Sequence, residues 1–304
     1  IMKIVIMGAG AVGSYYGGVF KRNGIDVTLI NRGKHHEAII NNGLNIRSFW
    51  GDYNVDVNAS NKTSNLGTFD VVFLTTKLYS NQEAIKQLSN LCSDKTLIIT
   101  IQNGVSSYEE LSKFFDSANI IPAATYIEAE IISPGTILQK GSSVVIEIGE
   151  IDGNFSERLN NIKNKLSFEE LEINISKDIK ASLWKKMISV GAFGTIMTSF
   201  RSSFGEIISS MYGEEVLRGT MNEILEIGKL DGVNLNDVDI DKVVHGLKEE
   251  SDSITSSMQQ DLTNSKPLEI DNILGHVVVL SKKYNYPTPF STTLVSSLQK
   301  FKEG

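Results

Sequence analysis

The residues of this chain whose types and spacing most clearly predict chemistry run from Gly8 to Gly13 and read G-A-G-A-V-G. An apolar run, residues 3–7, precedes them, and a stretch with helical character, residues 11–23, overlaps their end. Between a strand and a helix this pattern predicts a dinucleotide site, because its glycines permit a tight turn, close approach of the backbone to a pyrophosphate, and close packing of the helix on the sheet. The first N–H groups of the helix would bind the phosphates; the alternative is a glycine turn with a purely structural role. The predicted cofactor-binding residues of this loop are Gly8, Ala9, Gly10, Ala11, Val12 and Gly13.

The end of the second expected strand, residues 26–30, predicts which dinucleotide binds. An NAD site usually carries an acidic residue there, which holds the ribose 2′-hydroxyl. Here Asn31 and Arg32 follow the strand, and neither is acidic. A guanidinium can bind a 2′-phosphate through two N–H groups, and an asparagine can donate to it without repulsion. These residues predict NADP(H) as the cofactor, unless Arg32 is only a solvated charge, which would leave the cofactor open.

Polar side chains follow further apolar runs in the first half. Lys77 ends V-V-F-L-T-T-K, and Asn103 follows T-L-I-I-T-I-Q. Ligands of open parallel sheets lie outside the carboxyl ends of the strands. Taken singly, each residue is more simply a solvated strand end, but together they predict contact with a nicotinamide ribose or a substrate. Thr125 is a weaker candidate of the same kind.

Two charged residues of the second half lie beside apolar positions. Lys186 borders the apolar face of an expected helix, residues 181–189, and Glu269 follows Pro267, a residue suited to the first turn of a helix. From the pattern alone, Lys186 is best interpreted as a surface lysine whose aliphatic stem lies on apolar surface. Glu269 is likewise best interpreted as a first-turn charge that the helix dipole favours.

The composition excludes several classes of protein. The chain has 304 residues and a net charge of −7, so it has no general positive field for a nucleic-acid backbone or an anionic membrane. A single cysteine, Cys92, rules out an intramolecular disulfide, and four histidines without ligand spacing argue against a catalytic metal. No apolar run reaches the roughly 18 residues of a membrane span. We therefore expect a cytoplasmic protein with no metal and no nucleic-acid or membrane partner.

The order of expected elements predicts the fold class. Apolar, β-branched runs alternate with helical stretches up to about residue 171, which is typical of a parallel sheet covered on both faces. Beyond that point helices are expected over residues 217–230, 241–252 and 270–284. We predict an α/β protein in which a Rossmann-type parallel-sheet domain, residues 1–173, precedes an all-helical C-terminal domain, residues 174–304.

These motifs, in this order, resemble the ketopantoate reductase family, the 2-dehydropantoate 2-reductases. The shared elements are G-x-G-A-x-G from Gly8, T-x-K ending at Lys77, Q-N-G around Asn103, L-W-x-K ending at Lys186, and S-S-M-x-x-D followed by P-L-E-I-D around Glu269. The resemblance implies NADPH-dependent reduction of a small 2-oxo acid, ketopantoate, to pantoate, without a metal. Pantoate is a precursor of pantothenate and coenzyme A.

The same resemblance implies roles for individual residues. Lys186 would be the general acid, and Asn103 and Lys77 would lie beside the nicotinamide and the substrate. Ser257 would contact the carboxylate end of the substrate, and Glu269 would help to hold substrate and cofactor. An ammonium suits this reaction because hydride transfer to a carbonyl carbon leaves negative charge on the oxygen. Burial would favour the neutral lysine and a nearby glutamate the charged one.

The sequence departs from the family pattern in one respect. The family's lysine is usually followed at four and eight residues by asparagines, whereas this chain has Val190 and Gly194 there. Each polar substrate group left without a partner would cost on the order of 1–3 kcal/mol. The substrate-binding prediction therefore includes both positions and leaves open a related reductase of a less polar 2-oxo acid. A third interpretation is a non-catalytic NADP(H)-binding protein. The apolar helices also leave open whether the protein forms a homodimer.

Overall fold

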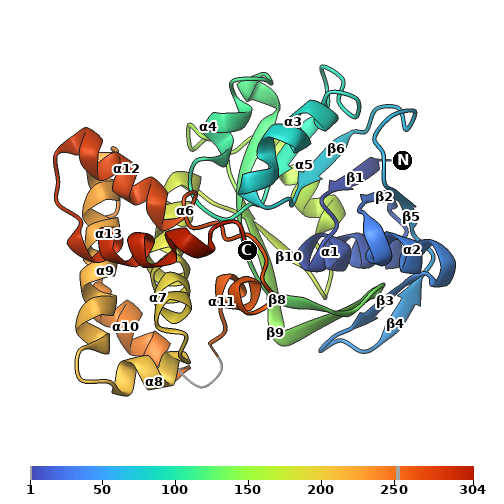
Figure 1. Cartoon of the computed structure of the whole chain (residues 1–304). Helices are drawn as coiled ribbons and strands as arrows, with labels where there is room; N and C mark the ends of the chain where they lie inside the picture. Colours follow the sequence, from blue (N-terminus) through green and yellow to red (C-terminus); the bar gives the residue numbers. More distant parts are fainter. Residues whose placement is uncertain (1, 251–253) are drawn as a thin grey trace. The chain divides into compact units, whose positions relative to one another are not determined.

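The computed structural model describes residues 2–250 and 254–304 and divides into two compact units (Figure 1). Of the described residues, the first unit comprises 2–103 and 107–179, and the second comprises 104–106, 180–250 and 254–304. Within these residues, every helix is too short or too polar to cross a membrane. The predicted fold class is confirmed: a mostly parallel sheet precedes a helical C-terminal region.

The first unit is built on a mixed sheet whose strands run in the order β4-β3-β9-β8-β7-β6-β1-β2-β5, with β10 paired to β9. From β5 to β8 all neighbours are parallel, whereas β8 and β9 form a long antiparallel hairpin, green in Figure 1. The strands are β1 (Lys3–Met7), β2 (Asp26–Ile30), β3 (Leu44–Arg47), β4 (Tyr53–Val55), β5 (Asn58–Ser60), β6 (Val71–Leu74), β7 (Leu97–Thr100), β8 (Ile120–Ser133), β9 (Thr136–Ile148) and β10 (Glu172–Ile175).

Strand β1 illustrates why the sheet is covered on both faces. Because successive side chains of a strand point to opposite faces, Ile4 and Ile6 belong to one core cluster and Val5 and Met7 to another. Helix α1 packs on the first face, and α3 and α4 pack on the second (Figure 1). The helices of this unit are α1 (Ala11–Arg22), α2 (Gly33–Asn42), α3 (Asn81–Leu88), α4 (Ser107–Leu111) and α5 (Glu157–Leu166), with short 3₁₀ turns at Leu78–Ser80 and Ser117–Asn119.

The second unit is helical and has a core of its own. Helix α12 packs on α9 and α13, and α13 packs on α7 and α9 (Figure 1). The helices are α6 (Ile179–Lys186), α7 (Ala192–Phe200), α8 (Phe204–Ser209), α9 (Gly213–Leu230), α10 (Ile240–Glu249), α11 (Ser257–Thr263), α12 (Leu274–Tyr284) and α13 (Pro289–Leu298), with a π-helical segment at Met187–Gly191 and a 3₁₀ turn at Gln299–Phe301. The expected helix start near Pro267 is wrong, because residues 267–269 are non-helical and α12 begins at Leu274.

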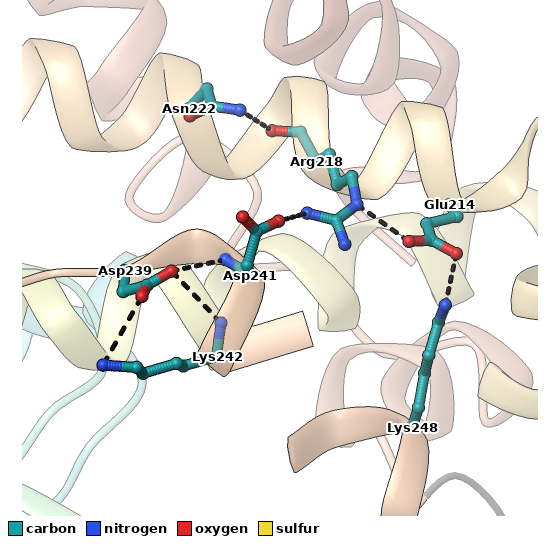
Figure 2. Close-up of polar contacts among 7 residues, drawn as sticks. All are labelled: Glu214, Arg218, Asn222, Asp239, Asp241, Lys242 and Lys248. Atoms are coloured by element: carbon teal, nitrogen blue, oxygen red, sulfur yellow. Dashed lines mark hydrogen bonds and ion pairs between the residues drawn. The ribbon is translucent and has the colours of Figure 1, made fainter. Parts of the chain in front are cut away.

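A cluster of partly exposed ion pairs ties α10 to α9 (Figure 2). The Arg218 guanidinium donates to Glu214 at 2.8 Å and to Asp241 at 2.6 Å, and Lys248 forms a further ion pair with Glu214. Asp239 accepts from the first N–H groups of α10 and so caps that helix. All of these charges have partners on the same two helices, which is consistent with a structural role.

Candidate functional site

The glycine-rich loop after β1 has the geometry that its sequence predicts. Gly8 has φ +97°, and a Cβ there would lie 2.7 Å from the backbone nitrogen of Thr76. A Cβ at Gly13 would lie 2.8 Å from Ile6 of β1, so this glycine lets α1 approach the sheet. At Gly10 the nearest heavy atom to such a Cβ is 3.9 Å away. The loop is therefore tight where it meets the protein and open at Gly10, as a pyrophosphate requires.

The first turn of α1 supplies donors for an anion. Gly10 occupies the N-cap and has no side chain to bond the first N–H groups, and the first turn of this described helix contains no acidic residue. These N–H groups and the positive end of the helix dipole favour a phosphate. Thr75, which the sequence analysis missed, donates its hydroxyl to the Gly8 carbonyl at 2.7 Å and so holds the loop against the end of β6.

Asn31 and Arg32 follow β2 and fit a phosphorylated ribose. Asn31 is buried, its Oδ1 lies 2.8 Å from Nδ1 of His36, and its Nδ2 has no hydrogen-bond partner among the described residues. An orphaned buried donor is rare in proteins and indicates a missing acceptor. Arg32 is exposed and makes one contact of 3.4 Å with Glu83, which leaves further guanidinium donors for a 2′-phosphate. These donors match the predicted NADP(H).

His35 connects this region to the glycine-rich loop, although no sequence pattern marked it. Its Nδ1 accepts the Gly135 N–H at 3.0 Å, so a proton must sit on Nε2, which lies 3.0 Å from the Ser14 hydroxyl. Ser14 in turn donates to the Ala9 carbonyl at 3.0 Å. Burial lowers the pKa of His35, in agreement with the neutral tautomer that these contacts require.

The structure brings Lys77 and Asn103 to equivalent places beyond two neighbouring strands. Leu74 of β6 pairs with Thr100 of β7 in the parallel register, and each candidate follows three residues later. Both residues are half-buried. Thr125 lies in β8 and is buried; its hydroxyl contacts the Tyr16 hydroxyl.

In the helical unit, Lys186 and Glu269 interact. Lys186 is the last residue of α6 and is half-buried, whereas Glu269 is 4% exposed and lies in the loop before α12. Burial lowers the pKa of the Lys186 ammonium to about 8, and the Glu269 carboxylate partly opposes that shift. Neither residue behaves as its pattern alone suggested, since the ammonium is withdrawn from water and the carboxylate lies outside a helix. An ammonium of this kind can hold or donate a proton near neutral pH.

A π-helical segment, Met187–Gly191, follows Lys186 directly. In an α-helix the positions four and eight residues on would drift by about 40° and 80° from the lysine. A π-helical turn contains more residues than an α-helical turn, so the chain rotates less per residue. The segment therefore brings Val190 and Gly194 closer to the helix face that carries Lys186. Val190 is 37% exposed, and Gly194 is buried.

Ser256 and Ser257 have different environments. Ser256, which the sequence analysis passed over, caps α11 by accepting the Gln259 N–H at 3.2 Å and donates to the Gly194 carbonyl at 3.1 Å. Ser257 is exposed, so its hydroxyl is accessible to a ligand. The S-S pair therefore combines a structural serine with an exposed one.

Comparisons with known proteins cover almost the whole chain. The family model described as ketopantoate reductase PanE/ApbA matches residues 4–153, and the model of its C-terminal part matches residues 178–303. A 2-dehydropantoate 2-reductase of Pyrococcus horikoshii is 30% identical, covering 100% of this chain and 98% of the relative. An uncharacterized oxidoreductase of Bacillus subtilis is 28% identical over 99% of both chains. The crystal structure of a PanE/ApbA family ketopantoate reductase from Ralstonia eutropha superposes with a TM-score of 0.91 at 27% identity, covering 99% of this chain and 98% of that one.

Proposed function

The chain belongs to the ketopantoate reductase family of oxidoreductases, and we propose that it uses NADPH to reduce ketopantoate, or a closely related 2-oxo acid, to the 2-hydroxy acid. The observation that carries this proposal is the Lys186–Glu269 pair, in which burial lowers the pKa of the ammonium to about 8. A lysine with that pKa is still mostly protonated at neutral pH and is a stronger acid than a solvated lysine. Lys186 is therefore suited to protonate an oxygen that gains negative charge.

Each part of the proposed reaction has residues of this chain to perform it. NADPH, when bound, supplies the hydride. The glycine-rich loop and the N-terminus of α1 would hold its pyrophosphate, while Asn31 and Arg32 would hold the 2′-phosphate. Lys77 and Asn103 would orient the nicotinamide end and the substrate. Lys186 would stabilise the developing alkoxide and protonate it, with Glu269 favouring the charged lysine before the reaction.

The decisive measurement is NADPH oxidation with ketopantoate and a panel of other 2-oxo acids. Lys186→Met should lower kcat by about 10²–10⁴-fold, the range for loss of a general acid, while NADPH binding is retained. Lys185→Met is the matched control, because Lys185 is exposed and forms an ion pair with Asp237 at 2.5 Å. Turnover by the Lys186 variant at the wild-type rate would contradict the proposed acid. Binding of NADPH without turnover of any acid would favour a binding protein instead.

A second candidate substrate is a less polar 2-oxo acid, and the observation that favours it is the side chain of Val190. This apolar residue is 37% exposed one π turn beyond Lys186, where the family usually has an asparagine. The double variant Val190→Asn/Gly194→Asn should raise kcat/KM for ketopantoate relative to apolar 2-oxo acids by about tenfold per restored hydrogen bond. A Cβ at Gly194 would lie 3.4 Å from the Ser256 hydroxyl oxygen, so that side needs only a small adjustment. High activity of the wild type on ketopantoate, unchanged in the double variant, would reject this alternative.

A further inference from the structure

A buried network of amide side chains joins four segments at the carboxyl edge of the sheet. Gln102, two residues beyond β7, is buried, and its Nε2 donates to Asn81 Oδ1 at 2.6 Å. The same amide nitrogen donates to the backbone carbonyl of Thr76 at 2.8 Å, and the Thr76 hydroxyl oxygen lies at 3.1 Å. Asn81 Nδ2 donates to the Glu110 carboxylate of α4 at 2.7 Å. The Gln102 Oε1 accepts from the Thr100 hydroxyl at 3.3 Å.

The orientation of both amides is determined by groups that cannot donate. A carboxylate and a backbone carbonyl are acceptors, so Glu110 requires the nitrogen of Asn81 and Thr76 requires the nitrogen of Gln102. Asn81 then presents its oxygen to Gln102, which is the arrangement observed. Each side chain in the network therefore determines the orientation of the next. A buried network in which every polar group is paired holds its segments rigidly.

The segments that this network joins are those that carry the candidate cofactor contacts. Thr76 immediately precedes Lys77, and Gln102 immediately precedes Asn103. Thr76 also packs against the glycine-rich loop, because a Cβ at Gly8 would lie 2.7 Å from its backbone nitrogen. A shift of Thr76 would therefore move the loop and the lysine together.

We propose that Gln102 is a positioning residue for the dinucleotide: it holds the strand ends that carry Lys77 and Asn103, and the turn at Gly8, in the arrangement that receives the cofactor. This inference rests on the proposed function only in taking NADP(H) as the ligand. Gln102 acts through its contacts with Thr76 and Asn81. Substitution of Gln102 should therefore lower the affinity for the cofactor, and this loss should be separable from any loss of stability.

The test is direct titration of NADPH and, separately, NADH into the full chain, together with thermal unfolding of each variant. In Gln102→Glu a carboxylate replaces the donor that faces the Thr76 carbonyl, and leaving buried acceptors unpaired should weaken NADPH binding by about tenfold or more. Gln82→Glu is the matched control, since Gln82 is exposed on α3, the helix that carries Asn81. The control adds the same negative charge, so it measures general repulsion of the phosphates.

The double variant Gln102→Glu/Glu110→Gln separates positioning from folding. In the double variant the Asn81 amide can rotate by 180°, so that its nitrogen faces the carboxylate introduced at position 102 and its oxygen faces the amide introduced at position 110. Part of the stability lost in the single variant should therefore return. The Thr76 carbonyl would still face a carboxylate, so binding should stay weak. NADPH affinity of Gln102→Glu within twofold of the control, or affinity that returns with stability in the double variant, would overturn the proposal. Failure of the wild type to bind NADPH would overturn the proposed cofactor, and titration with NADH would then test Gln102; binding of neither would overturn both.

Discussion

Two buried glutamates of the helical unit, Glu223 and Glu269, are similarly inaccessible but have different partners. Glu223 on α9 is 6% exposed and accepts three hydrogen bonds from the start of α13: the Phe290 N–H at 2.9 Å, the Ser291 N–H at 2.7 Å and the Ser291 hydroxyl at 2.6 Å. Glu269 is 4% exposed and acts on the Lys186 ammonium. The first carboxylate meets groups that never change charge, and the second meets a group that titrates.

The difference shows that burial of a carboxylate does not by itself identify a functional site. Glu223 satisfies N–H groups that a helix start leaves without partners, and it lies at the positive end of the α13 dipole. It therefore stabilises the fold. Glu269 instead keeps a buried lysine charged, which costs stability and supports proton transfer. Substitutions at the two sites should accordingly have opposite signatures.

The largest effect on stability is expected at Glu223. Glu223→Gln retains the shape but turns an amide toward backbone N–H groups, so it should lower the free energy of unfolding by about 2–3 kcal/mol, the cost of losing hydrogen bonds to a charged group. Urea unfolding measures this change. Glu226→Gln on the same helix is the control, because the Glu226 side chain is 40% exposed and pairs with Lys229 at 2.8 Å. Equal stability of the two variants would contradict the capping role.

Substitution of Lys186 should change stability in the opposite direction. Its pKa is 10.5 in an unfolded chain and about 8 in the fold, so below pH 8 the lysine is charged in both states and the full penalty of burying the charge is present. The penalty is lost as the pH rises from 8 to 10.5, because the folded state releases its proton first. Lys186→Met should therefore be more stable than the wild type at pH 7, and this gain should shrink toward pH 10.5.

Thermal unfolding of Lys186→Met and wild type across that pH window measures the gain. Lys185→Met serves as the control again, since Lys185 is exposed and should show no such pH dependence. A Lys186 variant less stable than the wild type at pH 7 would mean that the lysine contributes more to the fold than its desolvation costs.

The pH profile of turnover should distinguish Glu269 from Glu223. Reduction needs the protonated lysine, so kcat should fall as the pH rises through about 8. Because the Glu269 carboxylate raises the pKa of Lys186, Glu269→Gln should move this fall to lower pH. Glu223→Gln should leave the profile where it is. A profile that moves in the Glu223 variant, or that stays in place in the Glu269 variant, would contradict the division of roles.

The sequence predicted elements and single residues better than the contacts between them. Strands over residues 3–7 and 26–30 are confirmed at the same bounds, because their apolar side chains are buried on both faces. Strands β4 and β5 are only three residues long and half-buried or exposed, so any apolar alternation in them is too short to recognise. Lys186 and Glu269 were selected through the resemblance to a family, because no local sequence pattern distinguished them.

Contacts between distant residues had no detectable sequence signal. Gln102 meets Asn81 and Glu223 meets Ser291 only because the chain folds back on itself. Each of these polar residues would read as an ordinary solvated side chain in its own segment. The wrong prediction of a helix start at Pro267 also arises from contacts between distant residues. Pro267 suits the first turn of a helix, but tertiary contacts hold the loop around Glu269. One of them is the hydrogen bond that the Leu268 N–H donates to the Lys302 carbonyl at 2.9 Å.

The smallest effect is expected in the partly exposed ion-pair cluster of Figure 2, which extends the comparison from buried to partly solvated carboxylates. Arg218 has two carboxylate partners, much as Glu223 has several donors, yet about a third of its side chain is exposed. Water and salt screen such pairs, so Arg218→Met should lower the free energy of unfolding by no more than about 1 kcal/mol. Urea unfolding at low and high salt measures this, with Lys242→Met as the control, and high salt should remove most of the difference. A salt-independent loss as large as that of Glu223→Gln would mean that the number of partners, rather than their burial, determines how strongly a charged group stabilises this fold.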